Sequence, residues 1–197
     1  MALFRAVPES RLGDANKQYY RYDTVRIPSN VPYVIDNLWE WLRPINMPSR
    51  RHAVYASPTP ELALANASAR LEEGDRYIAC RVVIEPQAVK IAQLSVRDAR
   101  EHKDIRAIMG WLGKHSTQVT EISTTEKQRL SMLFMPGFHR DELEALRQEH
   151  PFVQQVCESA QELSTFWSSA LREPQDSEGE LFFELAGSQI SYGLERI

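Results

Sequence analysis

Two glutamates near the C-terminal end of the chain, Glu178 and Glu180, are separated by one residue. The run from Glu178 to Leu185 alternates with a period of two, which predicts a strand that also places Glu184 on the face of these glutamates. Carboxylates at positions i and i+2 stand roughly 6.5 to 7 Å apart at the backbone. Their repulsion raises the pKa of one or both, which a fold tolerates where a developing positive charge comes between them. A solvated surface strand is the alternative that this run alone leaves open.

Arginines that could belong to a binding site occur in two parts of the sequence. Arg21 lies between tyrosines in the run Gln18 to Tyr22, whose aromatic composition predicts an early strand. A lone arginine at such a position is ordinarily a surface residue. Arg43, Arg50 and Arg51 are close together and are expected to lie in a solvated loop.

A second short strand is predicted for His52 to Ser57, and it stops before Pro58 because proline cannot continue a central ladder. The helix that follows has Thr59 as its N-cap and is expected to close at Gly74. The Val- and Ile-rich stretch from Tyr77 to Ile84 predicts a strand covered on both faces. Ser57 thus lies at the end of a predicted strand, directly before a predicted helix with an N-cap.

The region from about residue 95 to 172 is predicted to be mostly helical. Its strongest signal is the apolar stripe from Phe152 to Ala170, which keeps helical spacing for five turns. An earlier helix is predicted between Val34 and Leu42. It contains Trp39 and Trp41, and since i and i+2 lie on different helix faces, one of the two is expected to be exposed.

In their order along the chain, these motifs resemble the mono-ADP-ribosyltransferase family, in the subgroup built on an arginine, a serine motif and a Glu-x-Glu pair. Tyr20-Arg21-Tyr22 is similar to the arginine strand, and Glu178-Gly179-Glu180 to the late acidic pair. Val54-Tyr55-Ala56-Ser57-Pro58, with the helix and strand after it, is similar to the serine motif. That motif is usually Ser-Thr-Ser, so only Ser57 carries over. A histidine-tyrosine-glutamate subgroup also exists, and Tyr55 fits it in part.

The resemblance covers roughly residues 15 to 90 and 176 to 185. It implies an α+β fold with a split mixed β-sheet, in a single domain over residues 1–197 with a helical insertion at about 95–172. It also implies an enzyme that cleaves NAD⁺ and transfers ADP-ribose to a protein side chain or a nucleic acid. Ser123-Thr124-Thr125 is closer to Ser-Thr-Ser in letters, but it lies in the helical region, so Ser57 is preferred.

The same resemblance assigns roles to individual residues. Glu180 would stabilise the oxocarbenium-like transition state of NAD⁺ cleavage, and Glu178 would orient or deprotonate the acceptor. Arg21 would bind the phosphates, Ser57 would lie in the floor of the nicotinamide pocket, and a tyrosine would stack on the pyridinium ring. The two tyrosines placed for stacking are Tyr55 and Tyr20. Glu184 is interpreted as structural.

Composition narrows the remaining classes of function. The net charge of −4 argues against a protein that binds nucleic acid mainly through phosphate neutralisation. The five histidines have no metal-ligand spacing, so no metal is expected. Cys80 and Cys157 are expected to be buried, free thiols. The first residues lack an export signal and no run of 18 apolar residues occurs, so a cytoplasmic protein without membrane contact is expected.

By analogy with the family, such a transferase would suit a toxin or a phage-defence effector with a neutralising antitoxin or immunity partner. The alternative is a non-catalytic binding protein with the same fold. It is suggested by the tryptophan pair, because tryptophan is enriched at interaction hot spots.

Overall fold

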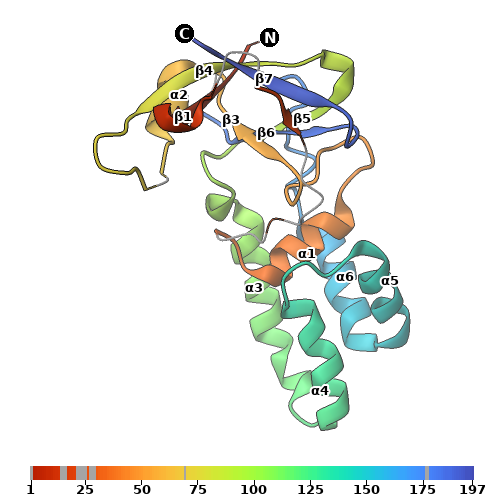
Figure 1. The fold of residues 1–197 in the computed structure, drawn as a ribbon. Helices are drawn as coiled ribbons and strands as arrows, with labels where there is room; N and C mark the ends of the chain where they lie inside the picture. Colours follow the sequence, from red (N-terminus) through yellow and green to blue (C-terminus); the bar gives the residue numbers. More distant parts are fainter. Residues whose placement is uncertain (1, 14–16, 21–25, 27–29, 69, 176–177) are drawn as a thin grey trace. The chain divides into compact units, whose positions relative to one another are not determined.

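The computed structural model describes residues 2–13, 17–20, 26, 30–68, 70–175 and 178–197 (Figure 1). The chain divides into two compact units. The sheet unit comprises Met1–Thr24, Asn46–Arg97 and Ala170–Ile197, and the helical unit comprises Val25–Ile45 and Asp98–Ser169. The fold class is α+β, and every described strand belongs to the sheet unit.

Two antiparallel sheets form the sheet unit. The order β1-β4-β7-β2 makes a four-stranded sheet, and the order β3-β6-β5 makes a three-stranded sheet. The elements of this unit are β1 (Leu3–Pro8), β2 (Tyr19–Tyr20), β3 (Val54–Ala56), α2 (Pro60–Ala65), β4 (Tyr77–Val83), β5 (Val89–Gln93), β6 (Leu181–Leu185) and β7 (Ser191–Arg196).

The prediction of a mixed sheet is wrong for these strands, since all of their pairings are antiparallel. The β5–β6 pair gives the reason. The chain leaves β5 at Gln93 and re-enters β6 at Leu181, which lies directly opposite Gln93. Strand β6 must therefore run back along β5.

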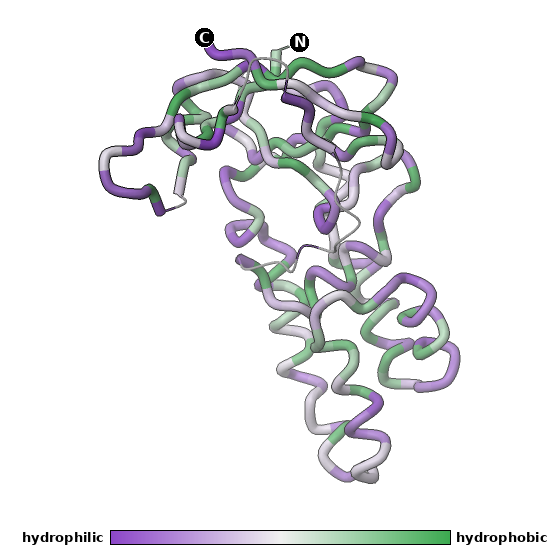
Figure 2. Tube along the Cα trace, viewed as in Figure 1, coloured by the Kyte–Doolittle hydropathy of each residue, from purple (hydrophilic) through white to green (hydrophobic). Residues whose placement is uncertain are grey.

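Apolar side chains from both sheets form one buried core, and hydrophobic residues recur along the strands (Figure 2). On β6, alternate residues point into this core, as the period of two in the sequence predicted. The loop between α2 and β4 is mostly hydrophilic by contrast (Figure 2). The buried core residues are Leu3, Ile78, Cys80, Val82, Leu181, Phe183, Leu185, Tyr192 and Leu194.

Two predictions in the middle of the sheet unit need correction. Helix α2 ends at Ala65 instead of reaching Gly74, which lies in a later turn with a φ of 82°. Leu64 is exposed, so the helix lacks the buried apolar stripe whose packing would stabilise further turns. Strand β4 has exposed side chains at Arg81 and Val83, so it is not covered on both faces.

The helical unit confirms the prediction of a mainly helical region and also includes the earlier helix α1. That helix ends as predicted before Pro44, with Arg43 in the extended conformation that a following proline favours. The helices are α1 (Tyr33–Leu42), α3 (Lys103–His115), α4 (Thr124–Ser131), α5 (Arg140–Glu149) and α6 (Pro151–Leu163). None of the helices in the described part of the chain combines the length and apolar character that crossing a membrane needs.

Both tryptophans of α1 are buried, so the expectation that one is exposed is wrong. Each indole N–H has an internal acceptor. Trp39 Nε1 donates to Asp104 Oδ2 at 3.1 Å, and Trp41 Nε1 donates to Glu144 Oε2 at 3.0 Å. Burial of a tryptophan is favourable when its polar N–H finds a partner inside. The observation that suggested a binding protein is thereby removed.

The segment Ser123-Thr124-Thr125 begins a helix, as its position in the helical region predicted. The Ser123 hydroxyl accepts from the backbone N–H of Glu126, and the Glu126 carboxylate accepts from the backbone N–H of Ser123. This reciprocal capping box explains the Ser and Glu spacing by helix initiation alone.

Candidate functional site

The pairing of β3 with β6 determines which candidate residues lie together. Residues that are directly opposite in an antiparallel pair share a face of the sheet. Tyr55 lies opposite Phe182, whereas Val54 and Ala56 lie opposite the core residues Phe183 and Leu181. Tyr55 therefore lies on the sheet face that points away from the core cluster.

Ser57 and Glu180 lie next to the last paired residues at one end of the strand pair. Ser57 directly follows Ala56, and Glu180 directly precedes Leu181, so each is one step beyond the last paired residues. Ser57 is bridged to Phe4, and the period of two gives it the face of Tyr55. Glu180 precedes β6, and its backbone is bonded to Leu94 and Val96. The register of the pair thus assigns Ser57 and Glu180, from two distant parts of the sequence, to the same end of β3 and β6.

The backbone at Ser57 is fixed by β1. Ser57 N–H donates to the Phe4 carbonyl at 2.8 Å, and Phe4 N–H donates to the Ser57 carbonyl at 2.9 Å. Ser57 is buried, Glu180 is half-buried, and the half-buried Tyr55 ring lies 5.8 Å from the Phe182 ring, centroid to centroid. A hydroxyl, a carboxylate and an aromatic surface can together hold a polar ring and face a cation.

Glu178 departs from the sequence prediction. Strand β6 begins at Leu181, so Glu178 is not part of the strand and the period of two does not place it beside Glu180. Its side chain is exposed and forms an ion pair with Arg97. The reason lies in Gly179, where the chain passes so close to the backbone of Leu94 that a regular strand with side chains cannot form there.

Two predicted ligand-binding residues remain, Arg21 and Tyr20. Arg21 lies outside the residues that the structure describes. Tyr20 belongs to β2, in the four-stranded sheet, where it pairs with Ser191 of β7 and is 51% exposed.

Three charged residues that the sequence analysis left out of the site are buried in the sheet unit. Arg50 and Arg51 are only 5% and 4% exposed, so the expectation that they lie in a solvated loop is wrong. Glu184, whose face is that of Tyr55, is also buried, and its Oε2 accepts from the backbone N–H of Ser49 at 2.7 Å. This bond ties Ser49, which directly precedes the two arginines, to β6. The one sequence signal was their position just before the predicted strand His52 to Ser57.

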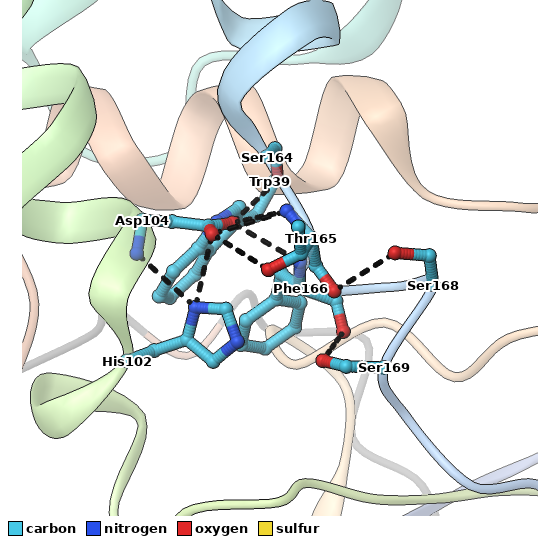
Figure 3. A network of polar contacts seen from close by, with 8 residues as sticks. All are labelled: Trp39, His102, Asp104, Ser164, Thr165, Phe166, Ser168 and Ser169. Atoms are coloured by element: carbon cyan, nitrogen blue, oxygen red, sulfur yellow. Dashed lines mark hydrogen bonds and ion pairs between the residues drawn. The ribbon is translucent and has the colours of Figure 1, made fainter.

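A second polar cluster, in the helical unit, centres on the fully buried Asp104 (Figure 3). Its carboxylate accepts hydrogen bonds from Ser164 Oγ at 2.6 Å and from the backbone N–H groups of Thr165 and Phe166 at 3.0 and 3.1 Å. His102 Nδ1 lies 3.3 Å from Oδ1. These bonds, with that of the Trp39 indole, join α1, the start of α3 and the segment after α6.

Burial alone would raise the pKa of Asp104, but the hydrogen bonds from His102, Ser164 and Thr165 outweigh it and hold that pKa well below the ordinary value. The cluster also explains why the apolar stripe does not continue as helix to Ala170. The N–H groups of Thr165 and Phe166 donate to Asp104 instead of to helical carbonyls. Because both of its oxygens accept hydrogen bonds, Asp104 is interpreted as a structural residue that holds these elements together.

Metal and thiol chemistry have little basis among the described residues. No group of three or more His, Cys, Asp or Glu side chains there could hold a metal ion. Cys80 and Cys157 are buried and free, as predicted. Burial raises the pKa of both thiols, that of Cys157 to about 12, so neither is a ready nucleophile.

Comparisons with family models, with curated proteins and with solved structures find no match for this chain. The geometry of the outer sheet face is therefore the basis for the function proposed next.

Proposed function

We propose that this chain is an ADP-ribosyltransferase that cleaves NAD⁺ and transfers ADP-ribose to a macromolecular acceptor. The observation that supports it most is that Ser57 and Glu180 flank the last residue pair, Ala56 and Leu181, at the same end of β3 and β6. The α+β fold class is compatible with the resemblance, whereas the antiparallel pairing of the described strands departs from the mixed sheet that it implies. The fold-family assignment is part of the same proposal.

In this proposal Glu180 acts on the reacting ribose. The bond between nicotinamide and ribose breaks, its electron pair leaves with nicotinamide, and the ribose gains oxocarbenium character. Glu180 holds a ribose hydroxyl and faces the developing positive charge. Because the backbone of Glu180 is fixed by hydrogen bonds to Leu94 and Val96, little reorganisation is needed at the moment of reaction.

Glu178 then receives the proton of the acceptor as the acceptor forms its new bond to the ribose carbon. Its ion pair with Arg97 must open for this role. Both side chains are more than half exposed, and such surface pairs are worth only about 0 to 1 kcal/mol. The pair is therefore a small obstacle to an incoming acceptor.

NAD⁺ binding is assigned to Ser57 and Tyr55 and, by the resemblance, to Tyr20 and Arg21. Ser57 would hydrogen-bond to the nicotinamide portion, and Tyr55 would stack on the pyridinium ring, with Tyr20 as the second candidate for stacking. Arg21 would bind the phosphates. A planar guanidinium suits this role because it offers two parallel donors to phosphate oxygens.

The proposal extends to the biological role. A transferase that consumes NAD⁺ would suit a cytoplasmic toxin or phage-defence effector held in check by a neutralising partner. The acceptor is a protein side chain or a nucleic acid. Mass spectrometry of total protein and RNA from cells that express the chain distinguishes the two, because each ADP-ribosylated product has a defined mass increase.

The test of the proposed function is Glu180→Gln. We expect this variant to keep its circular-dichroism spectrum and its affinity for NAD⁺, while release of nicotinamide from labelled NAD⁺ falls about 10²- to 10³-fold. The amide keeps the shape of the side chain but lacks the charge that stabilises the transition state.

Glu173→Gln is the matched control, because Glu173 is an exposed glutamate of the same C-terminal region. It should release nicotinamide at the wild-type rate. Wild-type protein that releases none with protein or nucleic acid acceptors, or a fully active Glu180→Gln variant, would contradict the proposal.

A further inference from the structure

The last residue of β5, Gln93, is a fully buried glutamine whose side chain pairs with main-chain groups. Its Oε1 accepts from the backbone N–H of Gln175 at 2.7 Å, and its Nε2 donates to the backbone carbonyl of Gln175 at 3.1 Å. One amide that binds both backbone groups of a single residue reproduces the pairing of a neighbouring strand. The Gln93 side chain therefore fixes Gln175, which precedes the candidate carboxylates in the chain.

The Gln93 backbone is also paired, on the side toward Leu171. Gln93 N–H donates to the Leu171 carbonyl at 2.9 Å, and Leu171 N–H donates to the Gln93 carbonyl at 2.8 Å. Gln93 thus binds the chain that leads to β6 at two residues, Leu171 through its backbone and Gln175 through its side chain. Loss of its side-chain amide would remove both hydrogen bonds to the backbone of Gln175, a residue that is itself exposed.

The residues after Gln93 hold Glu180 in the same way. Leu94 N–H donates to the Glu180 carbonyl at 2.8 Å, and Glu180 N–H donates to the Val96 carbonyl at 2.7 Å. Between these bonds, a Cβ atom built on Gly179 would lie 1.8 Å from the Leu94 carbonyl oxygen and 3.2 Å from Gln93 Cγ. The Gln93 side chain therefore packs against the glycine next to Glu180 as well as binding Gln175.

We propose that Gln93 is a positioning residue that sets the place of the Glu180 carboxylate, and this proposal rests on the function proposed above. Gln93 acts through the chain at Gln175 and Gly179, on either side of Glu178, and does not touch the substrate. A displacement of a catalytic group by about 1 Å costs on the order of 100-fold in rate. Substrate-binding groups on β3 have their own supports, so KM for NAD⁺ should stay nearly constant while kcat falls.

The test is a double-mutant cycle of Gln93→Leu and Glu180→Gln, read as nicotinamide release from labelled NAD⁺ per folded molecule. Leucine keeps the bulk of the side chain and removes the amide. We expect Gln93→Leu to lower kcat by roughly 10- to 100-fold in the wild type and by less than about 3-fold in the Glu180→Gln background. A residue that only supports the fold would lower both by the same factor.

Gln87→Leu is the matched control, since Gln87 is an exposed glutamine just before β5, and it should leave kcat unchanged. If Gln93→Leu does not accumulate as folded protein, Gln93→Glu replaces it in the cycle, because a carboxylate keeps the acceptor and loses the donor toward Gln175. Equal losses in both backgrounds, or no loss in the wild type, overturn the positioning role alone. Absence of nicotinamide release from the wild type overturns the proposed function and the positioning role together.

Discussion

At the scale of single residues, Gly179 is the position where the backbone leaves least room. We expect Gly179→Ala to lower the free energy of unfolding by about 1–3 kcal/mol, because its methyl group would collide with the carbonyl of Leu94, a residue whose N–H is bonded to the Glu180 carbonyl. Urea denaturation followed by circular dichroism measures this loss.

Gly187→Ala is the comparison within the same unit, because the nearest atom to its added Cβ is Ile190 Cδ1 at 3.9 Å. That variant should differ from the wild type by less than about 0.5 kcal/mol. If the two glycine variants unfold at the same urea concentration, the close approach at Gly179 does not constrain the chain.

Sequence reasoning about single residues succeeded where the pattern was local. The alternation in β6 correctly placed Leu181 and Phe183 in the core and Glu184 on the opposite face. It failed at Glu178, because the backbone contact that excludes a strand there involves Leu94, a residue with no sequence relation to it. Burial of Arg51 was equally hidden, since it depends on how the segment before β3 folds onto the sheet.

At the scale of elements, the strands β3, β4 and β6 and the helices α1, α2 and α6 had individual predictions, and the other helices were predicted only as a helical region. Strands β1, β5 and β7 had no individual prediction. Each is short and gains its stability from partners far along the chain, as in the pairing of β1 with β4. The apolar stripe of α6 was correct in its spacing and wrong in its length, because Asp104 takes the N–H groups that would extend the helix.

The buried carboxylate of Asp104 joins several elements of the helical unit. We expect Asp104→Asn to lower the free energy of unfolding at pH 7 by about 3 kcal/mol, because the amide nitrogen would face N–H and O–H donors in place of an acceptor. Urea denaturation monitored by the helical signal measures the change. Asp141→Asn, at an exposed aspartate in the first turn of α5, should change it by less than about 1 kcal/mol.

The same carboxylate predicts a pH dependence. The pKa of Asp104 is lower in the folded than in the unfolded chain, so its stabilisation is complete above the unfolded value of about 3.9 and is lost as the pH falls below it. The stability gap between wild type and Asp104→Asn should therefore narrow by about 1.4 kcal/mol per pH unit below about 3.9. Because the group is buried, 0.5 M salt should leave this trend in place. A gap that is constant from pH 7 to pH 3 would contradict the assignment.

At the scale of the whole molecule, each of the two units contains one buried thiol. Cys80 lies in the core of the sheet unit and Cys157 in α6 of the helical unit, and both are fully shielded from solvent. A buried thiol with a raised pKa reacts with a maleimide only after its surroundings open. The two labelling rates therefore report separately on the opening of the two units.

We expect Asp104→Asn to accelerate labelling of Cys157 by on the order of 100-fold, which corresponds to a loss of about 3 kcal/mol in the unit that contains Asp104. Labelling of Cys80 should change by less than about 5-fold, because the core of the sheet unit is built from residues of its own strands. Mass spectrometry of the peptides that contain each cysteine gives both rates in one experiment without further substitutions. Gly179→Ala provides the reciprocal case, with faster labelling of Cys80 and little change at Cys157. If both thiols accelerate equally in both variants, the units open as one cooperative body.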